Sequence, residues 1–315
     1  MADCKIPVAV IFAPTACGKT ALIQDLFGLS SLSCFKGMGE VISADSQAVY
    51  KGMDIGTAKP TAEENANVPH HLIDIVTPDV QFGVGEFIDR ADGLCREIYG
   101  RGRIPLVVGG TGFYIRNFLL GLPVTPESDP VLREKLKQRI AQEGNDNLYN
   151  ELEIVDPDGA KKININDSYR ICRALEVFYT SGKPLSSYKL PDTLRSEYNF
   201  CTIVLNRPKE ELYSRIDSRV DEMFKRGLQE EFNSLIEKGY TKESPGLKAI
   251  GYREFFDNND VCEVAERIKL NSRHYAKKQY TFMRDIPEAI VINADETEKI
   301  KKIISDFILS SRKSV

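Results

Sequence analysis

Short apolar runs alternate with amphipathic stretches along most of the 315-residue chain. The runs have the length of buried strands and are too short to span a membrane, whereas the stretches between them space their apolar residues as helices do. Strands are expected at residues 8–12, 40–45, 69–76, 104–108, 200–206 and 289–294. Strands that alternate with helices predict an α/β fold with a parallel sheet flanked by helices.

The alternation stops near Pro123, and the pattern from there to about Arg195 is charged and helical without a convincing strand. Helices are expected at residues 129–142, 148–156 and 167–180. Asp167 can cap the last of them. We therefore expect an all-helical subdomain at 124–195, inserted into a core made of 1–123 and 196–315.

The first strand leads directly into residues 13–20, which read APTACGKT, and then into a helix. Such a turn aims free backbone N–H groups and the positive end of the helix dipole at one point, which suits phosphate oxygens. Lys19 adds a full charge, and the Thr20 hydroxyl is placed to hold Mg²⁺. Ala13 replaces the first Gly of the pattern GxxxxGK(S/T), and a small residue lets the backbone pass if its φ stays negative.

The alternative is an unrelated loop that contains Gly-Lys-Thr, but the strand before it and the helix after it favour a phosphate loop. The predicted core is thus a P-loop NTPase-like parallel sheet. Cys17 lies at the helix N-terminus near Lys19, where a thiol pKa can fall, and we favour the alternative that it is a small filler. The predicted phosphate or diphosphate site comprises Ala13, Pro14, Thr15, Ala16, Cys17, Gly18, Lys19 and Thr20.

Polar residues follow two further strands. Asp45 comes after the second strand, and a glycine-rich turn with a hydroxyl at Thr111 comes after the fourth. Ligands of open α/β sheets bind beyond the carboxyl ends of the strands, so both residues should share a crevice with the phosphate loop. Asp45 can equally be a helix N-cap.

The segment 267–284 carries six cations and no acid, with aromatic residues between them. A charge run is usually a solvated helix face, but in a chain with a net charge of −4 this one favours a polyanionic partner. The net charge excludes a global basic field. Seven cysteines without a CxxC pair argue against a disulfide framework and a zinc site. Because the start of the chain lacks the pattern of a signal peptide, we expect a cytoplasmic protein.

Several stretches together resemble one known family, the tRNA dimethylallyltransferases, also called tRNA isopentenyltransferases. The phosphate loop alone is weak support, and ADSQAVYKGMDIGTAKP carries most of the weight. The resemblance continues through PHHLIDI, PLVVGGTGFYI, NDSYRICRALEVFYTSGKPLS, LKAIGYREF and SRHYAKKQYTFMR, and so covers nearly the whole chain. The chain departs from the family pattern at Ala13, Cys17 and Phe282, where Gly, Ser and Trp are usual.

The resemblance implies transfer of a dimethylallyl group from dimethylallyl diphosphate to N6 of the adenosine 3′-adjacent to the anticodon of tRNAs, with release of diphosphate. Asp45 resembles the general base that takes the proton of the adenine amine. The loop amides, Lys19, Mg²⁺ on Thr20 and, by resemblance, Arg215 would stabilise the leaving diphosphate. Thr111 matches the family threonine on the acceptor side.

The acceptor base must leave its stack in the anticodon loop to reach a buried carboxylate. We therefore expect the partner to be the anticodon stem-loop of tRNA, bound by a monomer, with no membrane association. By resemblance, the tRNA-binding residues are Asp45, Ser46, Gln47, Ala48, Thr111, Arg133, Asp167, Tyr169, Arg170, Lys248, Ala249, Ile250, Gly251, Tyr252, Arg253, Lys277, Lys278, Gln279 and Arg284.

Three other functions compete with this interpretation. A prenyltransferase that acts on free adenine nucleotide would need neither the helical insertion nor the basic segment. A small-molecule kinase of the phosphate-loop type would turn over ATP without dimethylallyl diphosphate. A non-catalytic RNA-binding protein would have no use for Asp45 and Thr111 at strand ends.

Overall fold

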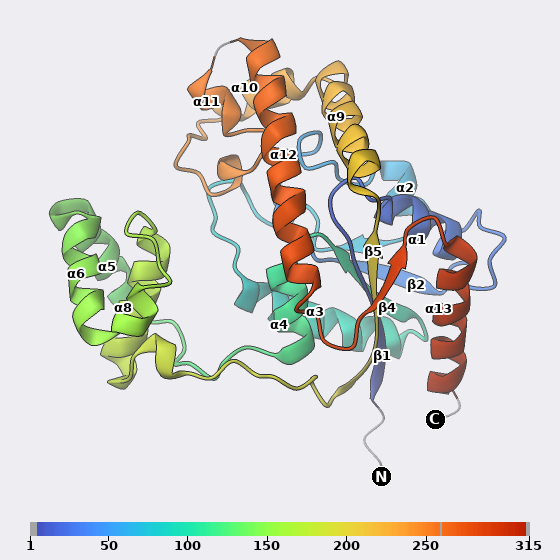
Figure 1. The fold of residues 1–315 in the computed structure, drawn as a ribbon, viewed down its shortest axis with the longest axis horizontal. Coiled ribbons are helices and arrows are strands. Elements are labelled where there is room, and N and C mark those ends of the chain that lie inside the picture. Colours follow the sequence, from blue (N-terminus) through green and yellow to red (C-terminus); the bar gives the residue numbers. More distant parts are fainter. Residues whose placement is uncertain (1–4, 259, 313–315) are drawn as a thin grey trace. The chain divides into compact units, whose positions relative to one another are not determined.

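The computed structural model describes residues 5–258 and 260–312. They fall into two compact units (Figure 1). The α/β unit comprises the chain up to Leu120 and from Leu194 onward, and the helical unit is Gly121–Thr193. The sequence predicted the insertion at 124–195. Among the described residues, no helix combines the length and the apolarity needed to cross a bilayer.

The α/β unit is built on a six-stranded sheet in the order β3-β2-β4-β1-β5-β6, in which all neighbouring strands are parallel. All six predicted strands are present. The third strand is much shorter than predicted because the backbone turns left-handed at Leu72 (φ 61°) and Asp74 (φ 55°). The strands are β1 (Ile6–Phe12), β2 (Gly39–Ser43), β3 (His70–His71), β4 (Ile104–Gly109), β5 (Tyr198–Asn206) and β6 (Ile290–Asn293).

Helices cover both faces of this sheet. The helices of the α/β unit are α1 (Lys19–Phe27), α2 (Ala62–Asn67), α3 (Val84–Gly100), α4 (Gly112–Leu120), α9 (Lys209–Lys225), α10 (Leu228–Glu237), α11 (Glu254–Asp257), α12 (Val261–Met283) and α13 (Thr297–Arg312). Between α10 and α11 the chain forms a short 3-10 helix, η2 (Gly246–Lys248), followed by turns in which Gly251 adopts a φ of 103°.

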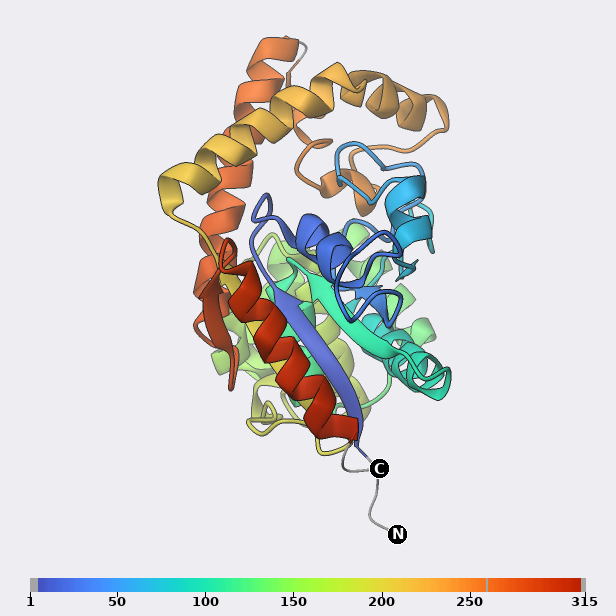
Figure 2. The same ribbon diagram turned by 90° about the vertical axis from the view of Figure 1, so that its right-hand side faces the viewer.

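The alternation of side chains along β1 separates two cores. Ala9 and Ile11 are buried in a cluster with α1 and with Ile300 of α13, and Figure 2 shows the red helix α13 alongside the blue strand β1. Near the other face, Phe87 of α3 stacks on Tyr114 of α4 with ring centroids 4.6 Å apart. The strands are thereby fixed from both sides, and their carboxyl ends are held at one edge.

Helices α9 and α12 extend beyond that edge and pack against each other (Figure 1). Lys269 of α12 pairs with Asp221 of α9 at 2.7 Å, and Arg273 pairs with Asp217 at 3.1 Å. Two of the six cations of the basic segment are therefore paired with acids of the neighbouring helix. The sequence did not indicate this pairing, because the two helices are far apart in the chain.

The helical unit contains α5 (Pro130–Glu143), α6 (Asn145–Val155), α7 (Pro157–Ala160), α8 (Ser168–Ser181) and the 3-10 helix η1 (Leu185–Ser187). Leu136, Leu152 and Leu175 form part of its own apolar core. Asp167 caps α8 as predicted, accepting a hydrogen bond from the backbone N–H of Arg170 at 3.1 Å.

Candidate active site

The phosphate loop connects β1 to α1 and carries its unusual backbone at two positions. Ala16 (φ 60°) and Gly18 (φ 103°) are left-handed, whereas Ala13 is not, as the prediction for Ala13 required. The Ala13 N–H donates to the carbonyl of Gly109 at 3.3 Å, which ties the loop to the end of β4. The helix begins at Lys19.

Lys19 bends back over its own loop. Its Nζ donates to the carbonyls of Ala13 at 2.9 Å and Pro14 at 3.0 Å. Burial lowers the pKa of Lys19 to about 8, although the nearby Asp45 carboxylate acts in the opposite direction. Among the described residues, the hydrogen-bond partners of the ammonium are thus the two neutral loop oxygens. An anion in the loop would replace them with stronger, charge-assisted hydrogen bonds.

Cys17 is fully buried, and burial raises the pKa of its thiol despite the nearby Lys19. The filler interpretation therefore fits better than a reactive thiolate. The Cys17 carbonyl accepts a hydrogen bond from Nε of Arg207 at 2.9 Å. Arg207 also pairs with Glu211 at 2.7 Å and Asp295 at 2.8 Å, so a buried guanidinium supports the loop from behind.

Gln279 of α12 joins the two glycine-rich turns. Its Oε1 accepts from the Thr15 N–H at 3.1 Å, and its Nε2 donates to the Gly110 carbonyl at 2.6 Å. A Cβ on Gly110 would come within 2.5 Å of that nitrogen, which explains the glycine. The resemblance put Gln279 among the tRNA contacts, but its side chain is buried with both amide ends in use.

Asp45 and Thr111 are brought together by the ends of β2 and β4. Oδ1 of Asp45 accepts from the N–H groups of Gln47 at 2.9 Å and Ala48 at 3.4 Å. Residues 46–49 form a turn, so Asp45 caps a turn and not a helix. Oγ1 of Thr111 accepts from the Ser46 N–H at 3.0 Å.

Tyr275 of α12 is a site residue that the sequence pattern did not single out. It is hydrogen-bonded to Thr111, and burial together with the Asp45 carboxylate raises its pKa to about 12. The phenol therefore stays protonated at neutral pH. Tyr275 lies one helical turn before Gln279 on α12, so both side chains face the same way. This spacing would have identified Tyr275 only if Gln279 had already been known to face the two turns.

These elements surround one cavity of about 530 Å³ at the carboxyl edge of the sheet. The phosphate loop contributes Thr15, Ala16, Gly18, Lys19 and Thr20, and the strand ends contribute Asp45, Ser46, Gln47, Ala48, Gly109 and Gly110. The segment 248–253 contributes Lys248, Ala249, Ile250 and Arg253, and α12 contributes Ile268, Ser272, Tyr275 and Gln279.

Two arginines of α9 differ in their relation to this cavity. Arg219 lines it, and burial lowers the pKa of its guanidinium while Asp45 opposes the change. No hydrogen bond or ion pair fixes the Arg219 side chain to another residue in the described part of the chain. Arg215, which the resemblance assigned to the diphosphate, is exposed, is not among the residues that line the cavity, and pairs with Glu211 at 2.8 Å.

The remaining predicted RNA contacts lie in two places. On α12, Lys277 and Lys278 are exposed, and Arg284 is exposed at the end of the helix.

In the helical unit, the Arg133 guanidinium lies 6.0 Å from the ring centre of Tyr169 and pairs with the buried Glu176 at 2.8 Å. Arg170 is exposed and pairs with Asp167 at 3.2 Å. The four residues predicted in the helical unit therefore form two pairs near the start of α8, Arg133 with Tyr169 and Arg170 with Asp167.

A phosphate loop, a strand-end carboxylate and a half-buried arginine without an ion-pair partner among the described residues surround one cavity and define an α/β protein of the phosphate-loop class. The family model for IPP transferase matches residues 48–286. The chain is 41% identical over 314 residues to a tRNA dimethylallyltransferase of Thermoanaerobacter sp. (strain X514), covering 96% of this chain and 98% of the relative. It is 43% identical to tRNA dimethylallyltransferase 1 of Trichlorobacter lovleyi, covering 90% and 92%.

Two solved structures are similar over nearly the whole chain. One is a tRNA isopentenylpyrophosphate transferase from Bacillus halodurans, with a TM-score of 0.68, 35% identity and coverage of 98% of this chain and 99% of that one. The other is a eukaryotic dimethylallyltransferase acting on tRNA, with a TM-score of 0.77, 30% identity and coverage of 96% and 79%. The chain belongs to the IPP transferase family, and the resemblance predicted from the sequence is confirmed.

Proposed function

We propose that the protein is a tRNA dimethylallyltransferase, which transfers the dimethylallyl group of dimethylallyl diphosphate to N6 of the adenosine 3′-adjacent to the anticodon. The observation that carries the proposal is the convergence of a phosphate loop, Asp45 and the unpaired Arg219 on one cavity, in a chain of this family. A donor that leaves as diphosphate and an acceptor that loses a proton need these groups.

On the donor side, the diphosphate would lie in the phosphate loop, among its free backbone N–H groups and the N-terminus of α1. Lys19 and Arg219 would then supply positive charge to the oxygens on which negative charge grows as the C–O bond breaks. We assign Arg219 the part first given to Arg215, because Arg219 lines the cavity and forms no ion pair with a carboxylate in the described part of the chain, whereas Arg215 pairs with Glu211.

On the acceptor side, we assign Asp45 the role of general base. The lone pair of an exocyclic adenine amine is delocalised into the ring, so its proton must leave as the C–N bond forms. Two backbone N–H groups fix the orientation of the Asp45 carboxylate. Thr111 and the protonated phenol of Tyr275 lie on the same side and would orient the base by hydrogen bonds.

The donor set at the loop fits Mg²⁺. Thr20 offers an exposed hydroxyl in the first turn of α1, at the edge of the cavity that contains Lys19. Mg²⁺ prefers such hard oxygens and takes most of its other ligands from water and substrate phosphates. We propose that Thr20 holds this ion, which would neutralise charge on the departing diphosphate.

The acceptor would be the anticodon stem-loop, with its target base turned out of the stack into the cavity. The exposed cations Lys277, Lys278 and Arg284 support a phosphate contact along α12, and Arg133 and Tyr169 support a second contact in the helical unit. Because one chain supplies the whole cavity, a monomer suffices, and a tRNA acceptor supports a cytoplasmic location.

The direct test supplies labelled dimethylallyl diphosphate and Mg²⁺ with unmodified tRNA in one reaction and with AMP in another. We expect label in the tRNA alone. Label in AMP would reveal a free-nucleotide prenyltransferase. ATP turnover without any label transfer would instead identify a phosphate-loop kinase.

A further inference from the structure

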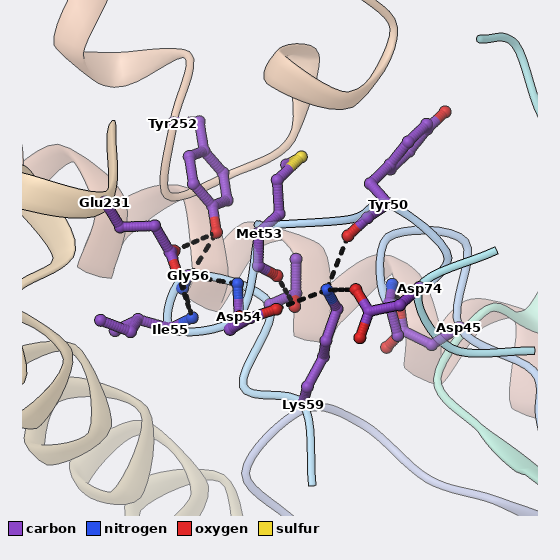
Figure 3. Close-up of polar contacts among 12 residues, drawn as sticks. Asp45, Tyr50, Met53, Asp54, Ile55, Gly56, Lys59, Asp74, Glu231 and Tyr252 are labelled. Atoms are coloured by element: carbon purple, nitrogen blue, oxygen red, sulfur yellow. Dashed lines mark hydrogen bonds and ion pairs between the residues drawn. The ribbon is translucent and has the colours of Figure 1, made fainter. Parts of the chain in front are cut away.

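Glu231 of α10 fills an anion-binding concavity of the backbone. Its carboxylate accepts hydrogen bonds from three successive N–H groups, those of Asp54 (2.8 Å), Ile55 (2.9 Å) and Gly56 (3.2 Å) (Figure 3). Successive N–H groups that converge in this way form a nest for an anion, and here the anion is a side chain of the protein itself. Charge-assisted bonds of this kind are about twice as strong as neutral ones.

Tyr252 closes the same cluster from the other side. Its hydroxyl donates to Oε1 of Glu231 at 2.6 Å and accepts from the Gly56 N–H at 3.1 Å. A Cβ on Gly56 would come within 2.6 Å of the Tyr252 ring, so only glycine fits at that position. Burial and the neighbouring Glu231 carboxylate raise the pKa of Tyr252, which keeps the phenol a donor.

Lys59 holds the other end of the loop formed by residues 54–60. Its side chain is 4% exposed, and Nζ donates to the carboxylates of Asp54 at 2.7 Å and Asp74 at 2.5 Å and to the Tyr50 carbonyl at 2.6 Å (Figure 3). The loop is therefore closed on itself by Lys59. Within the described residues, the hydrogen bonds that join residues 54–56 to α10 all go to Glu231.

The cluster connects two walls of the cavity. Residues 56–60 line one side, and residues 248–250 and Arg253, next to Tyr252 in the chain, line another. Within the described residues, the hydrogen bonds of the Glu231 and Tyr252 side chains go to residues 54–56 and to each other, and none goes to the phosphate loop. The backbone N–H of Tyr252 donates to the Ala249 carbonyl of the other wall at 3.2 Å. The part of the cavity that they organise is thus separate from the part built by Lys19 and its neighbours.

We propose that Glu231 is a positioning residue for the acceptor, which sets the spacing of the 54–60 and 248–253 walls so that an RNA base can enter beside Asp45. This inference rests on the proposed function in naming RNA as the ligand. The hydrogen bonds by which Glu231 holds the backbone of residues 54–56 do not depend on the proposed function.

The test compares Glu231→Gln with Glu230→Gln, since Glu230 is the exposed neighbour on the same helix and loses the same charge. A glutamine keeps one acceptor oxygen and turns its NH₂ group toward the remaining donors. We expect amide hydrogen exchange at residues 54–56 to accelerate by about tenfold to a hundredfold in Glu231→Gln, the factor for one lost charge-assisted bond. The KM for an anticodon stem-loop RNA should rise by about tenfold or more, with the KM for dimethylallyl diphosphate unchanged within about twofold. Glu230→Gln should match the wild type in all three measurements.

Unchanged exchange at residues 54–56 would overturn the proposal, as would an equal rise of both KM values. If Glu231→Gln does not unfold cooperatively, Tyr252→Phe decides, because it removes one hydroxyl and keeps the ring. Its exchange and RNA KM should change in the same direction by about threefold to tenfold, and unchanged values would refute the role. If the wild type transfers no label to RNA, the proposed function is wrong. Amide hydrogen exchange at residues 54–56 still tests whether Glu231 holds the loop.

Discussion

Replacing Arg219 by Ala, with Arg215→Ala as the matched control, separates two arginines one helical turn apart on α9. Arg219 lines the cavity and forms no hydrogen bond or ion pair with another residue that the structure describes, so its guanidinium is available to an anion. Arg215 is 46% exposed and already pairs with Glu211 at 2.8 Å. The two side chains have the same chemistry and differ in where they lie.

The expected effects follow from that difference. A preorganised donor aimed at a leaving group contributes about 2.7–4 kcal/mol to the transition state, so Arg219→Ala should lower kcat/KM by about 10²–10³. An exposed ion pair contributes about 0–1 kcal/mol, so Arg215→Ala should lower it by at most about fivefold. Initial rates of label transfer to an anticodon stem-loop at subsaturating dimethylallyl diphosphate measure both.

A stability measurement completes this test. Because Arg219 is desolvated and unpaired, its removal relieves a cost of the folded state, and Arg219→Met should unfold at the same Tm or a higher one. Equal losses of kcat/KM in Arg219→Ala and Arg215→Ala would refute the assignment. A Tm lowered by several degrees in Arg219→Met would show that this arginine holds the fold and does not await a ligand.

Three further outcomes are expected. Asp45→Ala should leave tRNA affinity nearly intact and lower kcat by about 10²–10⁴, as loss of a general base does, and near wild-type turnover would exclude that role. Neutralising Lys277 and Lys278 should flatten the salt dependence of tRNA binding by about one unit of slope per lost phosphate contact, and an unchanged slope would make them ordinary solvated lysines. The folded pKa of Lys19 is about 8 and its ordinary value 10.5, so between these values the unfolded chain binds more protons and stability should rise with pH. Urea unfolding at stepped pH should show this rise in the wild type and not in Lys19→Met.

The sequence predicted the strands and turns of this site because these depend on local patterns. An apolar run followed by Gly-Lys-Thr or Gly-Gly-Thr encodes its own strand and turn, and the edge where Asp45 and Thr111 meet follows from parallel pairing. The filler role of Cys17 was among the alternatives that the residues left open. For Asp45 the alternative was a helix N-cap, whereas its side chain caps a turn.

Side-chain destinations on helices could not be predicted in the same way. Arg215 and Arg219 flank the same apolar stripe of α9, and only the packing of α9 beside α12 decides which one meets the cavity. Gln279 sits in a basic stretch that favours a solvated or RNA-binding face, yet it is buried between two turns that it contacts 264 and 169 residues earlier in the chain. The pattern of one helix does not contain the partner against which it packs.

The attachment of α12 has a thermodynamic consequence. Gln279 bonds this helix to the loop proposed for the diphosphate, while the two preceding residues, Lys277 and Lys278, are exposed on the same helical turn. A displacement of α12 by one ligand must therefore alter the surroundings of the other. Such coupling is reciprocal: the factor by which bound RNA changes the affinity for the prenyl donor equals the factor by which the donor changes the affinity for RNA.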